Sequence, residues 1–343
     1  MPSLLKSKLL LPLLALAALL ALPALAQAKL TFVRGVFSPA VYVANDNGSG
    51  ARKIGPGNTP RISSDGALVA YAKEGKGHKL DLKLAAVAGG APKTLMSGLQ
   101  EPFYLAFSPN SELIAALRGP ELGKRKLVVI TVATGKQKVI ASGYFSGFSF
   151  SPEGNELVYA KSNSERWPPR SDVFRVSVAG GKAVALTSDH RSIDPLWGPR
   201  GQIVFAKLLE ANKRKYGPKN ELYLMDEKGK GVKRLTHTKV DPLLQGLFPT
   251  AWSSDGKRIL AEFQGQDTSY AVGVDAKTGA QHPIGKVGEA GLVGTAFSAD
   301  GKFVLASEGG FDPSNKHAVV RVPYGGGKAK VLVKNASEPD WSY

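Results

Sequence analysis

The chain contains no cysteine among its 343 residues. This absence excludes disulfide bonds, thiolate metal sites, a cysteine nucleophile and attachment of a lipid to an N-terminal cysteine. Methionine, tryptophan and histidine are also scarce, with three, four and five copies. A domain without disulfides depends on its buried core. About 315 residues follow the apolar N-terminal segment described below, and a chain of that length can form such a core.

Acidic residues are few compared with basic ones. The sequence has 28 Asp and Glu against 45 Lys and Arg, which gives a formal net charge of +17. Such an excess suits an acidic partner, and it also keeps a protein soluble.

Only one long apolar run occurs, from Leu9 to Ala26. Lys6 and Lys8 precede this run, and small residues end it at Ala26-Gln27-Ala28. This pattern predicts a secretory signal peptide over residues 1–28, cleaved after Ala28. An uncleaved membrane anchor is the competing interpretation. We expect cleavage, no stable membrane insertion afterwards, and a periplasmic or secreted protein.

A turn motif recurs along the rest of the chain, and a large apolar residue precedes nearly every copy. Successive copies begin 45, 43, 47, 55, 45 and 44 residues apart. Such a period indicates a repeat architecture. The copies are SSDG (63–66), SPNS (108–111), SPEG (151–154), GPRG (198–201), SSDG (253–256), SADG (298–301) and a final Ser342, which follows Trp341.

Each period alternates apolar and polar residues as strands do. The turn is followed by a run such as ALVAYA (67–72), then by a polar loop and a second run such as KLVVITV (126–132). A glycine-rich hairpin leads to a last short run such as KAVAL (182–186). Four antiparallel strands in about 45 residues are typical of one blade of a β-propeller.

Two incomplete repeats remain at the ends of the mature chain. Residues 29–58 read as the second, third and fourth strands of a blade, and EPDWSY (338–343) reads as a first strand alone. Unpaired sheet edges promote aggregation, so we expect the two ends to join as one blade. The prediction is an all-β, seven-bladed propeller in a single domain, 29–343. Its expected blades are 59–101, 102–146, 147–193, 194–248, 249–293, 294–337, and 338–343 with 29–58.

The repeats resemble the TolB-type, WD40-like propeller repeat of exported bacterial proteins. AVYVANDNGSGARKI (40–54), DPLWGPRGQIVFAK (194–207) and NELYLMDEKGKGVKRLT (220–236) carry this resemblance. It implies a propeller and export, and it names no partner. TolB itself joins a six-bladed propeller to an N-terminal α/β domain, for which the sequence after Ala28 leaves no room. We therefore expect a TolB-like protein that is not TolB.

Enzymatic motifs are missing. The sequence has no G-x-S-x-G, no G-x-x-x-x-G-K-[ST] and no H-E-x-x-H. We expect no catalytic residue, no metal and no cofactor. The histidines fall singly in different repeats, at His78, His190, His237, His282 and His317.

Basic charge gathers in the loops expected between the second and third strands. In the first four blades these loops span 73–79, 118–126, 161–171 and 207–219, with net charges of +2, +3, +2 and +4. The same loops of the next two blades each sum to −1. Such loops share one face of a propeller and often carry binding sites. The residues expected to bind a partner are Lys124, Arg125, Lys126, Arg166, Trp167, Arg170, Lys213, Arg214, Lys215 and Tyr216.

We expect a monomeric, non-enzymatic binding or scaffold module that docks an envelope protein or an anionic polymer, and no nucleic acid. Lipid headgroups are a further anionic candidate. The plainer interpretation is that exposed loops of a basic protein are basic. An alternative is a lactonase-like propeller hydrolase with its site at the mouth of the central channel, and a third is one part of a larger secreted assembly. The loop segment LLQGLF (243–248) is expected to anchor a partner or to close the channel mouth.

Overall fold

The structure is a computed structural model, and it describes residues 28–100, 104–120, 123–165, 168–209, 219–239, 245–265, 269–285, 291–309 and 316–342. Within these ranges the chain forms strands β1 to β27 and one 3₁₀ helix, η1 (Lys76–His78). No helix of the described ranges is long and apolar enough to cross a membrane. The expected signal peptide lies outside the described residues, apart from Ala28.

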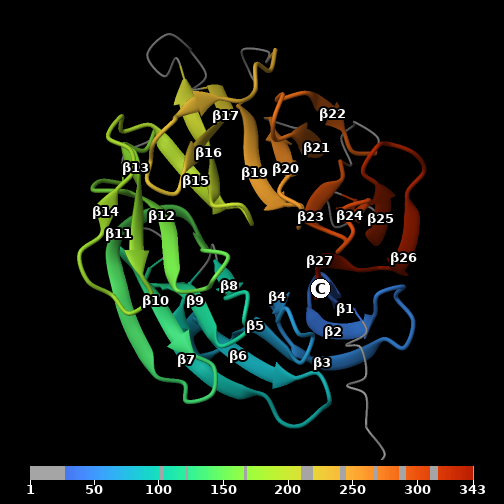
Figure 1. Cartoon of the computed structure of the whole chain (residues 1–343). Coiled ribbons are helices and arrows are strands. Elements are labelled where there is room, and N and C mark those ends of the chain that lie inside the picture. Colours follow the sequence, from blue (N-terminus) through green and yellow to red (C-terminus); the bar gives the residue numbers. More distant parts are fainter. Residues whose placement is uncertain are drawn as a thin grey trace, which may run out of the picture.

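The strands form sheets that stand around a common axis, as the blades of a β-propeller do (Figure 1). The all-β propeller prediction is therefore confirmed. One four-stranded sheet contains both ends of the described chain. In sheet order its strands are β27 (Ser337–Trp341), β1 (Lys29–Arg34), β2 (Ala40–Asn45) and β3 (Arg52–Pro56).

Two further sheets have four strands each, in the order of the sequence. One consists of β4 (Asn58–Ile62), β5 (Leu68–Glu74), β6 (Leu80–Ala86) and β7 (Lys93–Leu99). The other consists of β23 (Val293–Phe297), β24 (Phe303–Glu308), β25 (Ala318–Pro323) and β26 (Lys330–Lys334).

A seven-stranded sheet follows the first of these along the chain. Its strands are β8 (Leu105–Phe107), β9 (Leu113–Arg118), β10 (Arg125–Thr131), β11 (Gln137–Phe150), β12 (Glu156–Ser162), β13 (Ser171–Ser177) and β14 (Val184–Ala185). The long strand β11 pairs with β10 through its first half and with β12 through its second half.

The eight-stranded sheet completes the arrangement. Its strands are β15 (Ser192–Trp197), β16 (Gln202–Leu209), β17 (Lys219–Asp226), β18 (Lys233–Arg234), β19 (Gly246–Trp252), β20 (Arg258–Gln264), β21 (Ser269–Asp275) and β22 (Gln281–Pro283). A single parallel pair, Asn220 with Gly246, links β17 to β19.

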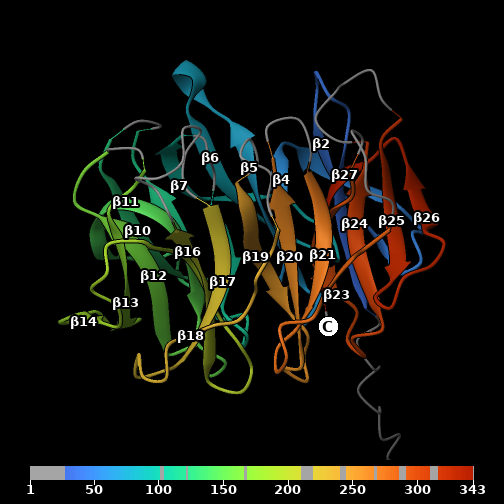
Figure 2. The same cartoon turned by 90° about the horizontal axis from the view of Figure 1, so that it is seen from above.

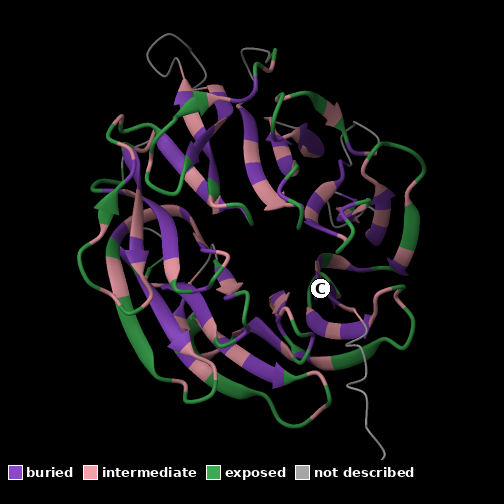
Figure 3. Cartoon of the chain, viewed as in Figure 1, coloured by how far each residue is buried: buried purple, intermediate pink, exposed green. Residues whose placement is uncertain are grey.

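The core lies between the faces of neighbouring sheets, and the middle strands are the most buried (Figure 3). Aliphatic and aromatic side chains alternate inward and fill these layers, because a strand points successive side chains to opposite faces. Between β9–β10 and β11–β13, for example, Leu117 and Leu127 pack with Leu157 and Tyr159.

The recurring turn motif is built by side chains that replace backbone hydrogen bonds. Ser63 Oγ accepts a hydrogen bond from the Leu68 amide at 2.9 Å and donates one to Asp65 Oδ1 at 2.5 Å. Gly66 adopts a φ of 69°, which favours glycine. Asp255 and Asp300 occupy the same place in later turns and accept hydrogen bonds from the equivalent serines. These carboxylates serve the turns, as the sequence predicted.

The C-terminal strand lies beside the N-terminal strand, as predicted from the two incomplete repeats. Strand β27 pairs antiparallel with β1, with Trp341 opposite Leu30 and Asp340 opposite Thr31. The Ser342 amide donates to the carbonyl of Lys29 at 3.0 Å. Trp341 is only 7 % exposed and packs in a cluster with Leu30 and with residues of β23 to β25.

The expectation for LLQGLF (243–248) is wrong for its described part. Strand β19 begins at Gly246, and Leu247 is fully buried in the core between two neighbouring groups of strands. The apolar character of this segment therefore reflects the start of a buried strand rather than an exposed anchor. Residues 243 and 244 lie outside the described ranges.

Candidate functional site: the loop face

Consecutive strands are antiparallel, so the connections between second and third strands all leave the same end of the sheets. The β5–β6 connection and the β17–β18 turn lie at opposite ends of the molecule (Figure 2). We call the end that carries the β5–β6, β9–β10, β12–β13 and β16–β17 connections the loop face. The described parts of the basic loops identified in the sequence lie in these connections.

The expected partner-binding residues divide into two groups. Arg166, Trp167, Lys213, Arg214, Lys215 and Tyr216 lie outside the described residues. Of the rest, Lys124, Lys126 and Arg170 are exposed on the loop face. Arg125 is different, because it is only 6 % exposed and its Nε donates to the carbonyl of Pro120 at 2.8 Å.

Basic residues at the feet of the loops are held by neighbouring side chains. Lys207 Nζ lies 2.7 Å from the Asp189 carboxylate, and Lys161 Nζ lies 5.4 Å from the centre of the Phe174 ring. Lysines further along the β5–β6 loop, Lys76 and Lys79, are exposed. The described strand-end cations thus stabilise the scaffold, whereas Lys76 and Lys79 of the β5–β6 loop face solvent.

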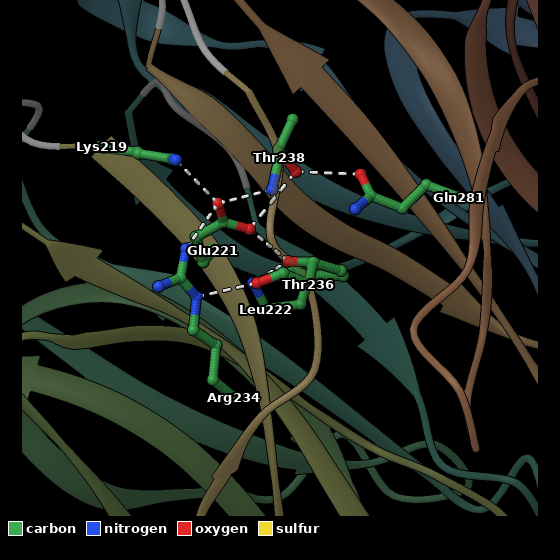
Figure 4. A network of polar contacts seen from close by, with 7 residues as sticks. All are labelled: Lys219, Glu221, Leu222, Arg234, Thr236, Thr238 and Gln281. Carbon is green, nitrogen blue, oxygen red and sulfur yellow. Dashed lines mark hydrogen bonds and ion pairs between the residues drawn. The ribbon is translucent and has the colours of Figure 1, made fainter.

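A buried carboxylate fixes the foot of the longest basic loop (Figure 4). Glu221, the third residue of β17, has no exposed surface. Its carboxylate accepts hydrogen bonds from Thr236 Oγ1 at 2.5 Å and from the Thr238 amide at 2.8 Å. Arg234 Nη2 and Lys219 Nζ lie 3.1 and 3.2 Å from its Oε1. These contacts offset the cost of burying the charge.

The network also joins elements that lie far apart in the sequence. Thr236 Oγ1 accepts a hydrogen bond from the Leu222 amide at 2.9 Å, and Thr238 Oγ1 contacts Gln281 Oε1 at 2.9 Å. Gln281 belongs to β22, which lies in the next group of strands. Strand β17, which follows the loop, is therefore joined by hydrogen bonds to the connection after β18, and through Thr238 to β22.

The β12–β13 loop ends in an equivalent network. Asp172 Oδ1 accepts hydrogen bonds from Thr187 Oγ1 at 3.3 Å and from the His190 amide at 2.9 Å. Thr187 Oγ1 accepts from the Val173 amide at 2.9 Å. The Leu-Thr ending of the repeat thus has a structural purpose, because its threonine joins the end of the fourth strand to the start of the third. The repeat that this sequence resembles also has the Leu-Thr ending, but the sequence alone does not explain why.

Another carboxylate, that of Asp194, lies on β15, the first strand of the eight-stranded sheet. Asp194 is partly buried and has a φ of 48°, and its carboxylate lies where a side chain on Gly147 would stand, 2.8 Å from the ideal Cβ position. Burial raises the pKa of Asp194 to about 7. Burial also raises the pKa of Tyr104, the Asp194 charge raises it further, and Arg125 lowers it. The charges of Asp194 and Arg125 thus act on Tyr104 in opposite directions.

The described part of the chain has no group of three or more His, Asp or Glu that could hold a metal ion. Two described histidines have clear structural partners. His190 Nδ1 contacts Asp172 Oδ2 at 2.6 Å, and His282 Nε2 contacts the carbonyl of Tyr324 at 2.6 Å.

Together these features define a β-propeller with a basic loop face. No protein-family model matches the chain, and no curated protein matches it in sequence. Solved structures match its fold. The β-propeller domain of the trilobed protease from Pyrococcus furiosus, described as having an open velcro topology, matches with a TM-score of 0.64 and 15 % identity, over 90 % of this chain and 92 % of that one.

Two other solved structures match the fold. TolB from Acinetobacter baumannii has a TM-score of 0.55 and 16 % identity, over 92 % of this chain and 83 % of that one. An oligogalacturonate lyase in complex with manganese has a TM-score of 0.61 and 13 % identity, over 89 % and 83 %. At such identities the likeness concerns the fold alone. The similarity to TolB-type propellers, inferred from the sequence, is confirmed at that level.

Proposed function

We propose that this protein is an exported, seven-bladed β-propeller that binds an anionic partner of the cell envelope through its loop face. The observation that carries the proposal is the position of the exposed cations. Lys76, Lys79, Lys124, Lys126 and Arg170 leave three consecutive groups of strands at the same end. A surface of one charge attracts a partner of the opposite charge and accelerates its association.

Seven blades are supported by the way the buried core divides. The seven-stranded sheet separates into two blades within β11, and the eight-stranded sheet separates at the single Asn220–Gly246 pair. Each resulting blade packs on the next through its own cluster of buried side chains. Between β1–β2 and β4–β6, Val41 and Val43 pack with Val69 and Tyr71. The β27–β1 pair completes the blade that contains both ends of the described chain, and in the proposed ring this blade lies between β23–β26 and β4–β7.

Binding, rather than catalysis, is favoured by the tasks that the carboxylates perform. Asp65, Asp255 and Asp300 accept hydrogen bonds within their own turns. Glu221 and Asp172 hold the feet of two loops. Rigid strands with fixed loop feet present exposed side chains at low entropic cost, which favours recognition of a partner.

Export rests on the apolar run of residues 9–26 and on the small residues that end it. Cleavage after Ala28 would release a chain that begins with Lys29, the first residue of β1. The proposed mature protein therefore starts at the strand that pairs with β27.

The proposal is tested with poly-L-glutamate as a probe, on the mature protein at increasing salt. We expect affinity to fall as salt rises, and to fall about tenfold or more when five exposed cations of the loop face are removed together. The variant changes Lys76, Lys79, Lys124, Lys126 and Arg170 to Ser.

The matched control removes the same charge from the opposite end. It changes Lys136, Lys182, Lys228, Lys230 and Lys277 to Ser, all of which are exposed beside turns between third and fourth strands. The control is expected to keep nearly the affinity of the natural protein. Equal losses in the two variants would mean that net charge alone determines binding, and the docking proposal would then be rejected. Pull-down from the native envelope with both variants then identifies the partner.

A further inference from the structure

A cavity of about 620 Å³ lies on the loop face where the two ends of the chain meet. Its walls come from the β1–β2 connection, from β4, from β23 and from the segment that leads into β27. Ligand sites of proteins have volumes of about 300–1,000 Å³, so this cavity is large enough for a small molecule. None of the exposed cations of the proposed docking surface lines it, although Lys76 and Lys79 belong to the same sheet as β4.

The apolar part of the cavity wall is aliphatic. It is formed by Val33, Val36, Pro39, Val293 and Pro339, polar side chains form much of the rest, and no Phe, Tyr or Trp lines the cavity. Val36 is 56 % exposed, and its neighbour Phe37 is 94 % exposed. Exposed apolar side chains beside a cavity favour an apolar ligand, since they lose contact with water when it binds. A saccharide would be expected to stack on Trp, Tyr or Phe rings, which are absent from the lining residues.

One polar group of the cavity has no partner. The Oδ1 atom of Asn58 is buried and accepts no hydrogen bond. A buried acceptor without a donor costs about 1–3 kcal/mol, which a ligand that offers an N–H or O–H would recover. Asn58 lines the cavity at the start of β4, so a rotation of its side chain would present the buried Oδ1 to such a ligand.

The charges around the cavity are already balanced within the protein. Glu338 Oε2 accepts a hydrogen bond from the Thr59 amide at 2.5 Å. Arg61 lies near Asp340, whose pKa burial raises and the Arg61 charge lowers. Because the charge of Arg61 already acts on a carboxylate of its own chain, the cavity favours an uncharged ligand over the anionic partner of the loop face.

We propose that this cavity binds a neutral aliphatic amide, the chemistry of a capped amino acid or of a peptide bond beside an aliphatic side chain. The amide N–H donates to Asn58 Oδ1, and the aliphatic group packs on Val36, Pro39 and Val293. Because the walls belong to both ends of the chain, a bound ligand joins β1 and β4 to β23 and β27. Ligand binding therefore stabilises the closed ring.

The test uses saturation-transfer NMR and thermal unfolding with N-acetyl-leucinamide and with N-acetyl-leucyl-leucinamide. Both probes are expected to bind at millimolar concentration and to raise the melting temperature, with no dependence on salt. Tighter binding of the longer probe indicates a peptide as the source, and equal binding indicates a single amino-acid derivative. Binding of maltose in place of the amides would overturn the proposed ligand class.

Two variants locate the site. Asn58→Leu removes the acceptor and Val36→Asp places a charge on the aliphatic wall, and each is expected to weaken binding about tenfold. Val184→Asp is the matched control, because Val184 is 51 % exposed on β14, outside the cavity, and should bind as the natural protein does.

If Asn58→Leu does not fold, valine methyl resonances of the natural protein decide the question. Those of Val33, Val36 and Val293 should shift on binding, and that of Val184 should not. The proposal is rejected if neither amide binds. It is also rejected if an amide binds but neither variant weakens its binding and none of these valine resonances shifts. Neither outcome depends on the affinity for poly-L-glutamate, so the proposed function is judged separately.

Discussion

Deleting residues 339–343 is expected to destabilise the whole domain, although the segment is only five residues long. The deletion removes Trp341, which is 7 % exposed and packs against Leu30 and Phe32. Truncation of a buried tryptophan costs about 3–5 kcal/mol. The loss also exposes the edge of β1, whose backbone groups then pair only with water.

Hydrogen bonds that join the two ends of the chain are lost as well. The shortest of them link Ser342 with Lys29 at 2.8 and 3.0 Å, and Asp340 with the Ile62 amide at 2.9 Å. At about 1 kcal/mol each, they bring the expected loss to roughly 7 kcal/mol. Natural domains have stabilities of about 5–15 kcal/mol, so the shortened protein should be close to unfolding at room temperature.

The assay is urea unfolding followed by tryptophan fluorescence and by circular dichroism. Trp341→Ala should lower the free energy of unfolding by about 3–5 kcal/mol. Trp341→Phe should lower it less, because the buried Nε1 of Trp341 has no hydrogen-bond partner and its loss is harmless. Phe37→Ala, at a residue 94 % exposed, is the control and should change almost nothing. A shortened protein that unfolds at the same urea concentration as the full chain would refute the pairing of the two ends and the closure of the ring.

Three further changes test individual features. Burial raises the pKa of Asp194 to about 7 from 3.8, so the folded state holds this proton more tightly than the unfolded state. The natural protein should therefore lose stability between pH 4 and pH 7. Asp194→Asn should be more stable than the natural protein at pH 8 but not at pH 4, which urea unfolding at both pH values checks. The same dependence of unfolding free energy on pH in both proteins would contradict the prediction. Thr236→Val keeps the shape of the side chain but removes its hydrogen bonds to Glu221 and Leu222, and it should lower the free energy of unfolding in urea by about 1–2 kcal/mol. Thr187→Val should have the same effect in the equivalent network. If neither variant loses stability, the Leu-Thr ending has no structural purpose. Gly198→Ala places a methyl group 2.8 Å from the Trp252 ring and should lower the melting temperature, with a cost of about 1–3 kcal/mol. Gly325→Ala, where the backbone has no positive φ and nothing lies within 4 Å, tests the loss of glycine alone.

The repeat and its four strands could be predicted from the sequence because they depend on local chemistry. A serine and an aspartate in the turn and a glycine with positive φ specify a hairpin without help from distant residues. The pairing of the two ends also followed from the sequence, because three strands at one end and one at the other leave a single way to complete a blade.

The site was less accessible to sequence reasoning. Arg125 and Lys126 are neighbours in one basic loop, yet Arg125 is buried and Lys126 is exposed. Strand alternation was the available signal, since β10 begins at Arg125 and successive side chains point to opposite faces. Leu247 was assigned to a loop for a related reason: the sequence does not reveal where β19 begins.

What the sequence by itself determined was the fold class, the repeat and the direction of the basic loops, because turns, alternation and charge are properties of short segments. Only the tertiary structure decided which charges are held by carboxylates, as Glu221 holds Arg234 and Lys219, and which remain exposed. It alone brought Asn58 and Pro339 to the same cavity, 281 positions apart along the chain. Contacts of that kind depend on how the sheets pack around the axis, and a short stretch of sequence contains no record of that packing.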